Sequence, residues 1–276
     1  MAIDNKKVKE KAKDLGARFV GIGSVDRWKE APETMRPESV LPKAKSVIIV
    51  CVPIPRGMVE TIPSHLWSRE HGHLMGTKVD EITDELANWL EDQRFKSTPV
   101  GGLAIAKDVH KKFTKLLGDA PYPIYSDFLE AGLALNWAGW KAGIGTMGKS
   151  GNLLVEEFGP NVILGGVITT AEIEPDPIVD YEICNNCDKC VEGCPGGAIS
   201  KDGTPGRPMF DAGKCFLTNA AEGRTLKAAL DRGDKAVSDY LMKTIFMQSE
   251  STPATCVCGK GCLADCPIDS RAKKLK

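Results

Sequence analysis

The chain has 276 residues, 42% of them hydrophobic, and its 36 lysines and arginines nearly balance 37 aspartates and glutamates, which leaves a net charge of −1. This length predicts one or two domains with a substantial core. The balanced charge argues against a nucleic-acid-binding surface, which usually carries a basic excess. Residues 1–17 lack the apolar core of an export signal, and no apolar stretch is long enough to span a bilayer. We therefore expect a cytoplasmic protein without a membrane segment.

Hydrophobic periodicity predicts both helices and strands in the first two thirds of the chain. Apolar residues three and four positions apart indicate amphipathic helices, whereas short apolar runs indicate strands. Helices are predicted for residues 4–17, 78–95 and 127–140, and strands for residues 19–23, 46–53 and 161–170. The second strand does not alternate, so we expect it to be buried on both faces, with Cys51 as a small buried hydrophobe. A proline-containing linker follows at residues 172–178.

A glycine-rich turn at residues 142–151 separates the third predicted helix from the last strand. It superficially resembles a dinucleotide-binding loop, but that fingerprint requires a strand before the turn, and here a helix precedes it. A plain structural turn is one alternative. We prefer a turn whose backbone closely approaches a large polar cofactor, which glycine permits sterically.

Nine of the ten cysteines lie in the last third of the chain. The first four form the run Cys-x-x-Cys-x-x-Cys-x-x-x-Cys-Pro, the spacing of bacterial two-cluster ferredoxins. A second run that also ends in Cys-Pro closes the chain. The candidate metal ligands are Cys184, Cys187, Cys190, Cys194, Cys215, Cys256, Cys258, Cys262 and Cys266.

Two other uses of these cysteines are less compatible with their spacing. Disulfide frameworks belong to short secreted chains. Structural zinc uses Cys-x-x-Cys pairs, but zinc does not explain three cysteines at successive three-residue spacings followed by Cys-Pro. We therefore predict two [4Fe–4S] clusters and a role in electron transfer.

Pseudo-symmetry between the two cysteine runs predicts how the ligands divide. The first cluster would be bound by Cys184, Cys187, Cys190 and Cys266. The second would be bound by Cys194, Cys215, Cys262 and one of Cys256 and Cys258. Which of the last two is the ligand stays open, because their run departs from the usual spacing.

The order of these motifs resembles the epoxyqueuosine reductases and the cobalamin-dependent reductive dehalogenases. The likeness extends from about residue 17 to residue 267 and is carried by residues 142–150, residues 164–169 and the two cysteine runs. It implies an α+β fold, with a nitroreductase-like cobalamin-binding domain over residues 1–178 and a ferredoxin-like domain with two [4Fe–4S] clusters over residues 179–276. It also implies an oxidoreductase that holds a corrinoid beside its clusters.

The same resemblance suggests roles for individual residues. The corrinoid would lie against Gly143, Gly145, Gly148, Ser150 and Thr169. The acid–base group of the family falls within residues 68–73, which makes Glu70, His71 and His73 candidates for proton delivery; surface residues on a loop entering a helix are the alternative. Lys149 matches a basic residue near the substrate pocket, with simple solvent exposure as its alternative.

The resulting hypothesis is a reductase. Electrons from a low-potential donor such as ferredoxin or flavodoxin would pass through the clusters to a corrinoid, which would reductively cleave a bond in a small-molecule substrate. We expect no tRNA substrate, because the chain has no basic excess and ends soon after Cys266, without the helical repeat region typical of epoxyqueuosine reductases. The alternatives are a corrinoid reductase or activator, and an electron-transfer protein without substrate chemistry of its own.

Overall fold

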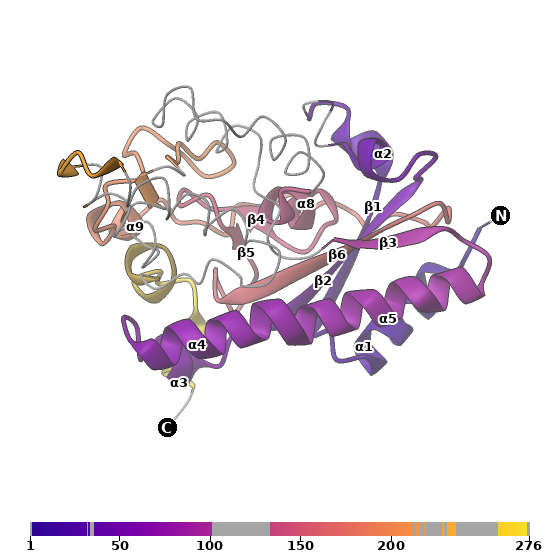
Figure 1. The fold of residues 1–276 in the computed structure, drawn as a ribbon, viewed down its shortest axis with the longest axis horizontal. Helices are drawn as coiled ribbons and strands as arrows, with labels where there is room; N and C mark the ends of the chain where they lie inside the picture. Colours follow the sequence, from indigo (N-terminus) through magenta and orange to yellow (C-terminus); the bar gives the residue numbers. More distant parts are fainter. Residues whose placement is uncertain are drawn as a thin grey trace.

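The fold is known from a computed structural model, which describes residues 2–31, 33, 36–100, 133–211, 214–215, 218, 228, 231–235 and 259–274. Figure 1 shows a central sheet with helices on both faces and the cysteine-bearing segments beyond one end. The sheet has the strand order β1-β2-β6-β3, and neighbouring strands are antiparallel. Its strands are β1 (Phe19–Ser24), β2 (Ser46–Pro53), β3 (Ser97–Val100) and β6 (Val162–Thr169). The strands predicted at residues 19–23, 46–53 and 161–170 are confirmed.

One face of the sheet is covered by two helices. These are α1 (Asn5–Asp14) and α5 (Val79–Asp92). Asp4 begins α1 as its N-cap, because its side chain accepts a hydrogen bond from the Lys6 amide at 2.8 Å. A Cβ at Gly165 of β6 would clash with Val79 of α5, so glycine at this position lets the helix approach the sheet closely. Helix α4 (His65–His73) and the π-helical turn η3 (Leu74–Lys78) lead directly into α5.

The opposite face of the sheet packs against α8 (Leu135–Lys141) and the 3-10 turn η1 (Val25–Trp28). The buried side chains of β2 alternate between the two faces: Ile48 and Val50 enter one core, and Ile49 and Cys51 enter the other. This confirms that β2 is buried on both sides. Of the predicted helix at residues 127–140, the part up to residue 132 lies outside the described residues. Other short elements before the linker are α2 (Pro37–Val40), α3 (Arg56–Val59), β4 (Thr146–Met147) and β5 (Leu153–Leu154).

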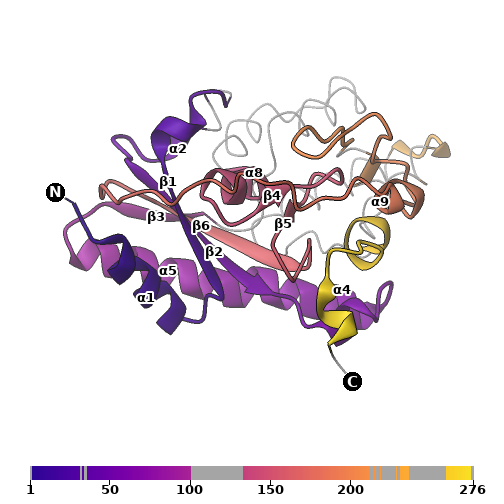
Figure 2. The ribbon, with the colours of Figure 1, turned by 180° about the vertical axis from the view of Figure 1, so that it is seen from behind.

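The linker at residues 172–178 is held against the sheet. The Asp176 carboxylate accepts hydrogen bonds from the Ile22 amide at 2.9 Å and from the Lys9 ammonium at 2.5 Å. Beyond the linker lie the cysteine-bearing α9 (Lys189–Glu192) and the C-terminal turns η4 (Lys260–Ala264) and η5 (Ser270–Lys273). Figure 2 shows α9 beside the yellow C-terminal coil that contains η4. The domain boundary at residue 178 stays a prediction.

Candidate functional site

Four cysteines from the two distant runs line one small cavity of about 20 Å³. Cys184, Cys187 and Cys190 come from the loop and first turn of α9, and Cys266 comes from the segment after η4. The loop curves around the cavity through left-handed backbone at Asn186 (φ 56°) and Asp188 (φ 60°), a conformation that Asn and Asp tolerate better than most residues. We call this set the first cysteine group.

The electrostatics of the first group fit a bound cation. Burial raises the pKa of the Cys266 thiol to about 11, and the neighbouring sulfurs of Cys184, Cys187 and Cys190 add to the rise. Burial also raises the pKa of Cys190, and the neighbouring sulfurs of Cys184 and Cys187 contribute less to this rise. Because thiolates are the ligands of metals, these sulfurs can be held together in that form only where a positively charged group compensates their repulsion.

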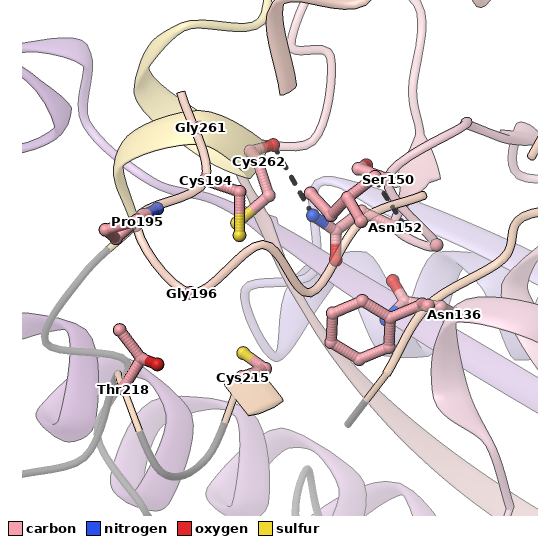
Figure 3. Close-up of a pocket in the computed structure, with 14 residues that line it drawn as sticks. Asn136, Ser150, Asn152, Cys194, Pro195, Gly196, Cys215, Thr218, Gly261 and Cys262 are labelled. Atoms are coloured by element: carbon pink, nitrogen blue, oxygen red, sulfur yellow. Dashed lines mark hydrogen bonds between the residues drawn. The ribbon is translucent and has the colours of Figure 1, made fainter. Parts of the chain in front are cut away.

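Three further cysteines line a larger cavity of about 190 Å³. In Figure 3 the sulfurs of Cys194 and Cys262 lie beside each other, and Cys215 faces the same space from the other side. The Ala198 amide donates a hydrogen bond to the Cys194 sulfur at 3.4 Å, and such donors to cluster ligands are one determinant of reduction potential. We call this set the second cysteine group. Cys256 and Cys258 lie outside the described residues, so its fourth member stays open.

Among the described residues, no three His, Cys, Asp or Glu side chains converge closely enough to hold a single metal ion. A tetrahedral zinc site needs that convergence, since its ligand bonds are only about 2.0–2.3 Å long. The spacing of the cysteines, which is that of bacterial two-cluster ferredoxins, favours the polynuclear cluster.

The glycine-rich turn lies between the two cysteine groups. Gly148 and Lys149 line the smaller cavity, Gly151 lines the larger one, and Ser150 lines both. The turn is closed by a hydrogen bond from the Gly151 amide to the Gly148 carbonyl at 3.0 Å. The sequence predicted a close approach of this turn to a cofactor, but it contained no signal that the neighbours would be cysteines.

The other residues assigned to a corrinoid contact the protein itself. A Cβ at Gly143 would clash with the Pro177 carbonyl, and one at Gly145 would clash with the Leu154 carbonyl. Thr169 is fully buried at the end of β6, where its hydroxyl bonds to Ser97 and to the backbone of residues 96 and 171. The glycines of the turn are therefore required by protein backbone that packs against them, and a role toward a corrinoid stays a prediction.

Lys149 is buried, with 4% of its surface exposed, and its ammonium is paired with the Asp188 carboxylate. Simple solvent exposure, the alternative raised for Lys149, is therefore wrong. Its neighbours are the cysteines of the first group. Asp188 was not predicted as a site residue from the sequence, although its position inside the first cysteine run was a signal that could have identified it as one.

Residues 68–73, for which a surface loop entering a helix was the alternative, belong to helix α4. His71 is buried against the Trp67 ring, 4.5 Å between centroids, and burial lowers its pKa to about 4. No partner for its Nδ1 atom is present among the described residues. Glu70 is partly exposed beside Arg69, and the His73 side chain lies outside the described part. None of the three lines either cysteine cavity as described, so their role in proton delivery stays a prediction.

Comparison with known proteins identifies the class. Residues 177–200 match the 4Fe-4S binding domain family. The epoxyqueuosine reductase of Gloeobacter violaceus is 25% identical over 253 residues, covering 81% of this chain and 68% of the relative; the enzyme of Bacillus subtilis is 27% identical over 196 residues, 66% of this chain and 42% of the relative. The structure of epoxyqueuosine reductase from Streptococcus thermophilus superposes with a TM-score of 0.55 at 20% identity, over 96% of this chain and 65% of that one. A catabolic reductive dehalogenase superposes with a TM-score of 0.53 at 16% identity, over 88% of this chain and 36% of that one.

The chain is thus an α+β protein with a ferredoxin-like part that binds [4Fe–4S] clusters, as the sequence predicted. It is a homologue of the epoxyqueuosine reductases, which are oxidoreductases, and it shares the fold of the reductive dehalogenases. Because it spans less than half of several of these relatives, their activity, substrates and partners do not transfer to it directly.

The expectation of a small-molecule substrate and no tRNA is contradicted. One of the similar structures is an epoxyqueuosine reductase with a tRNA-Tyr epoxyqueuosine-modified tRNA stem loop, with a TM-score of 0.50 at 20% identity over 80% of this chain and 60% of that one. The charge argument failed because a net charge summed over a whole chain says little about the local field at one surface. Among the described residues, no helix combines the length and apolar character needed to cross a membrane.

Proposed function

We propose that this chain is an iron–sulfur reductase of the epoxyqueuosine reductase type, with two [4Fe–4S] clusters, that acts on epoxyqueuosine in tRNA. The observation that carries the proposal is the division of seven described cysteines into two cavities that share Ser150 as a lining residue. Two redox groups on either side of one residue suit the passage of electrons from one to the other. The proposed substrate is inferred from the names of the homologues. We also propose that the protein acts in the cytoplasm.

The ligands follow from the two cysteine groups. Cys184, Cys187, Cys190 and Cys266 would bind the first cluster. Cys194, Cys215 and Cys262, with one of Cys256 and Cys258, would bind the second. When bound, such clusters supply electrons one at a time, at potentials that reach down to about −700 mV. Conversion of an epoxide to an alkene consumes two electrons and two protons and releases the oxygen as water, so the substrate would receive one electron twice.

A corrinoid is the finer part of the proposal. Its support is fold similarity to a reductive dehalogenase whose structure suggests a mechanism for B12-dependent dehalogenation, with a TM-score of 0.50 at 15% identity over 88% of this chain and 36% of that one. Protein backbone occupies the space beside Gly143 and Gly145, so the contacts of these two glycines give the corrinoid no support. We therefore derive no step of the reaction through this cofactor.

The proposal is tested with protein purified without oxygen and analysed for iron, sulfide and cobalt. Reduced protein is mixed with tRNA that carries epoxyqueuosine, and the nucleosides are then analysed by mass spectrometry. We expect the mass of the modified nucleoside to fall by one oxygen atom. Full cluster loading with unchanged nucleoside would refute the substrate, and reduction of a corrinoid held by a second protein would then favour the activator alternative. Stoichiometric cobalt would support the corrinoid.

A further inference from the structure

We propose that the buried ion pair of Lys149 and Asp188 sets the reduction potential of the first cluster. The inference rests on the proposed function, since it requires that the first cysteine group binds a cluster. It assigns Lys149 to electron transfer and not to substrate binding. The two residues would not ligate the cluster; their charges would change its reduction potential.

The placement of the two charges supports this role. Lys149 and Asp188 both line the smaller cavity together with Cys184, Cys187, Cys190 and Cys266. They are the only Asp, Glu, Lys or Arg side chains among the described residues that line it. The described lining of the larger cavity contains none. The two cysteine groups therefore have different electrostatic surroundings.

The two charges of the pair are not equally screened. The Lys149 side chain is 5% exposed and the Asp188 side chain is 27% exposed. Water screens the carboxylate more than the ammonium, because charges in the interior interact through a lower effective dielectric constant. The ammonium should therefore act on the cavity more strongly than the carboxylate, although the formal charges of the pair cancel.

Reduction of a cluster adds one negative charge to it. A nearby positive charge stabilises the reduced form and raises the potential, whereas a negative charge lowers it. Without Lys149 the first cluster should be harder to reduce, and without the Asp188 charge it should be easier to reduce. Because Lys149 is the less screened of the two, its removal should produce the larger shift.

The experiment measures both cluster potentials by anaerobic redox titration with detection by electron paramagnetic resonance. Cys190→Ala assigns the signal of the first cluster. For Lys149→Met we expect the ratio of reduced to oxidised first cluster, at a fixed potential, to fall at least about tenfold, which corresponds to about 59 mV for one electron. Asp188→Asn should shift the potential of the first cluster in the opposite direction by a smaller amount. Lys149→Arg keeps the charge, so its first-cluster potential should stay near that of the unmodified protein. The double variant of Lys149→Met and Asp188→Asn should lie between the two single variants.

Two controls separate an electrostatic role from a structural one. Lys45→Met removes the same charge from an exposed pair with Glu172 and should leave both potentials unchanged. The second cluster should shift less than the first in every variant. The backbone at Asp188 is left-handed (φ 60°), as it is at Asn186 (φ 56°). Asparagine tolerates this conformation, so it is a suitable replacement at position 188.

Unshifted potentials in variants with full iron content would overturn this inference and leave the proposed function intact. Shifts of the same sign in both single variants would also overturn it, since they would indicate a general disturbance. If Lys149→Met loses its iron, Asp188→Asn decides the question. Unmodified protein without clusters would instead refute the proposed function, and this inference with it.

Discussion

At the scale of the residue, Cys190 and Cys51 are thiols in very different surroundings. Cys190 lines the smaller cavity with three other cysteines. Cys51 is fully buried within β2, where burial raises the pKa of its thiol well above the usual range. A buried thiol of this kind behaves as a small hydrophobe.

We expect Cys190→Ala to lose about half of the iron, because a cluster of this type needs all four thiolates. The C-terminal part should also become less stable, since small metal-binding domains fold around their metal. Cys51→Ala is the matched control and should keep its full iron content. Iron and sulfide analysis per chain checks both, and unchanged iron in Cys190→Ala would show that it is not a ligand.

His71 makes the stability of the protein depend on pH. Burial lowers its pKa to about 4, below the usual value of about 6.5, so between these values the unfolded chain binds a proton that the folded protein excludes. The stabilisation is complete above about pH 6.5, falls as the pH decreases toward about 4, and amounts to about 3 kcal/mol at about 1.4 kcal/mol per pKa unit. In His71→Phe the thermal midpoint should change less with pH between about pH 4 and pH 6.5. A variant with the unmodified slope would contradict the assignment.

At the scale of the element, the two cysteine runs meet where α9 approaches η4. A Cβ at Gly261 of η4 would lie 2.6 Å from the Cys194 nitrogen and 2.7 Å from the Cys190 carbonyl oxygen. These are backbone atoms beside candidate ligands of both clusters. Glycine at this position therefore allows one short helical turn to rest directly on the other.

We expect Gly261→Ala to push the two turns apart, which should cost about 1–3 kcal/mol as overpacking typically does and should lower the iron content. Gly57→Ala provides the control, because nothing lies within 4 Å of a Cβ at that position in α3. Alanine there should be neutral or stabilise by up to about 1 kcal/mol. Thermal midpoints and iron analysis report both changes, and equal behaviour of the two variants would argue against the contact.

At the scale of the whole molecule, Asp269 joins the C-terminal end of the chain to the sheet. Its carboxylate accepts hydrogen bonds from Asn161 at 2.8 Å and from Arg271 at 2.7 Å, and Arg56 lies 3.6 Å away. Arg271 in turn donates to the Ile54 carbonyl at 2.8 Å. Residues at the ends of β2 and β6 are thereby connected to the segment that follows Cys266.

Burial by itself would raise the pKa of Asp269, but hydrogen bonds from Arg271 and Asn161 lower it overall. The contribution of this carboxylate to stability is therefore complete above its usual pKa of about 3.9 and is lost as the pH falls through the lower folded value. Asp269→Asn should destabilise the protein by up to about 3 kcal/mol near neutral pH, because it removes the buried carboxylate that pairs with the largely buried Arg271 guanidinium, whereas Arg56 keeps its ion pair with Glu60. Thermal unfolding from acid to neutral pH tests this, and an unchanged midpoint at neutral pH would show that the network contributes little.

The sequence by itself determined the features that depend on local order. The spacing of the cysteines predicted [4Fe–4S] binding, since neighbouring thiols in one loop share a cluster regardless of the rest of the chain. The unbroken apolar run of β2 predicted a strand buried on both faces, because side-chain alternation is a local property of a strand.

Only the tertiary structure decided which distant residues meet. The glycine-rich turn lies between two cysteine groups, and Lys149 pairs with Asp188, because the packing of the linker and the C-terminal turns against the sheet brings these segments together. No periodicity or spacing encodes such contacts, since they depend on how whole elements pack. Net charge failed to predict the tRNA ligand seen with a homologue for a related reason: it sums over the chain, whereas binding depends on charges that the fold gathers at one surface.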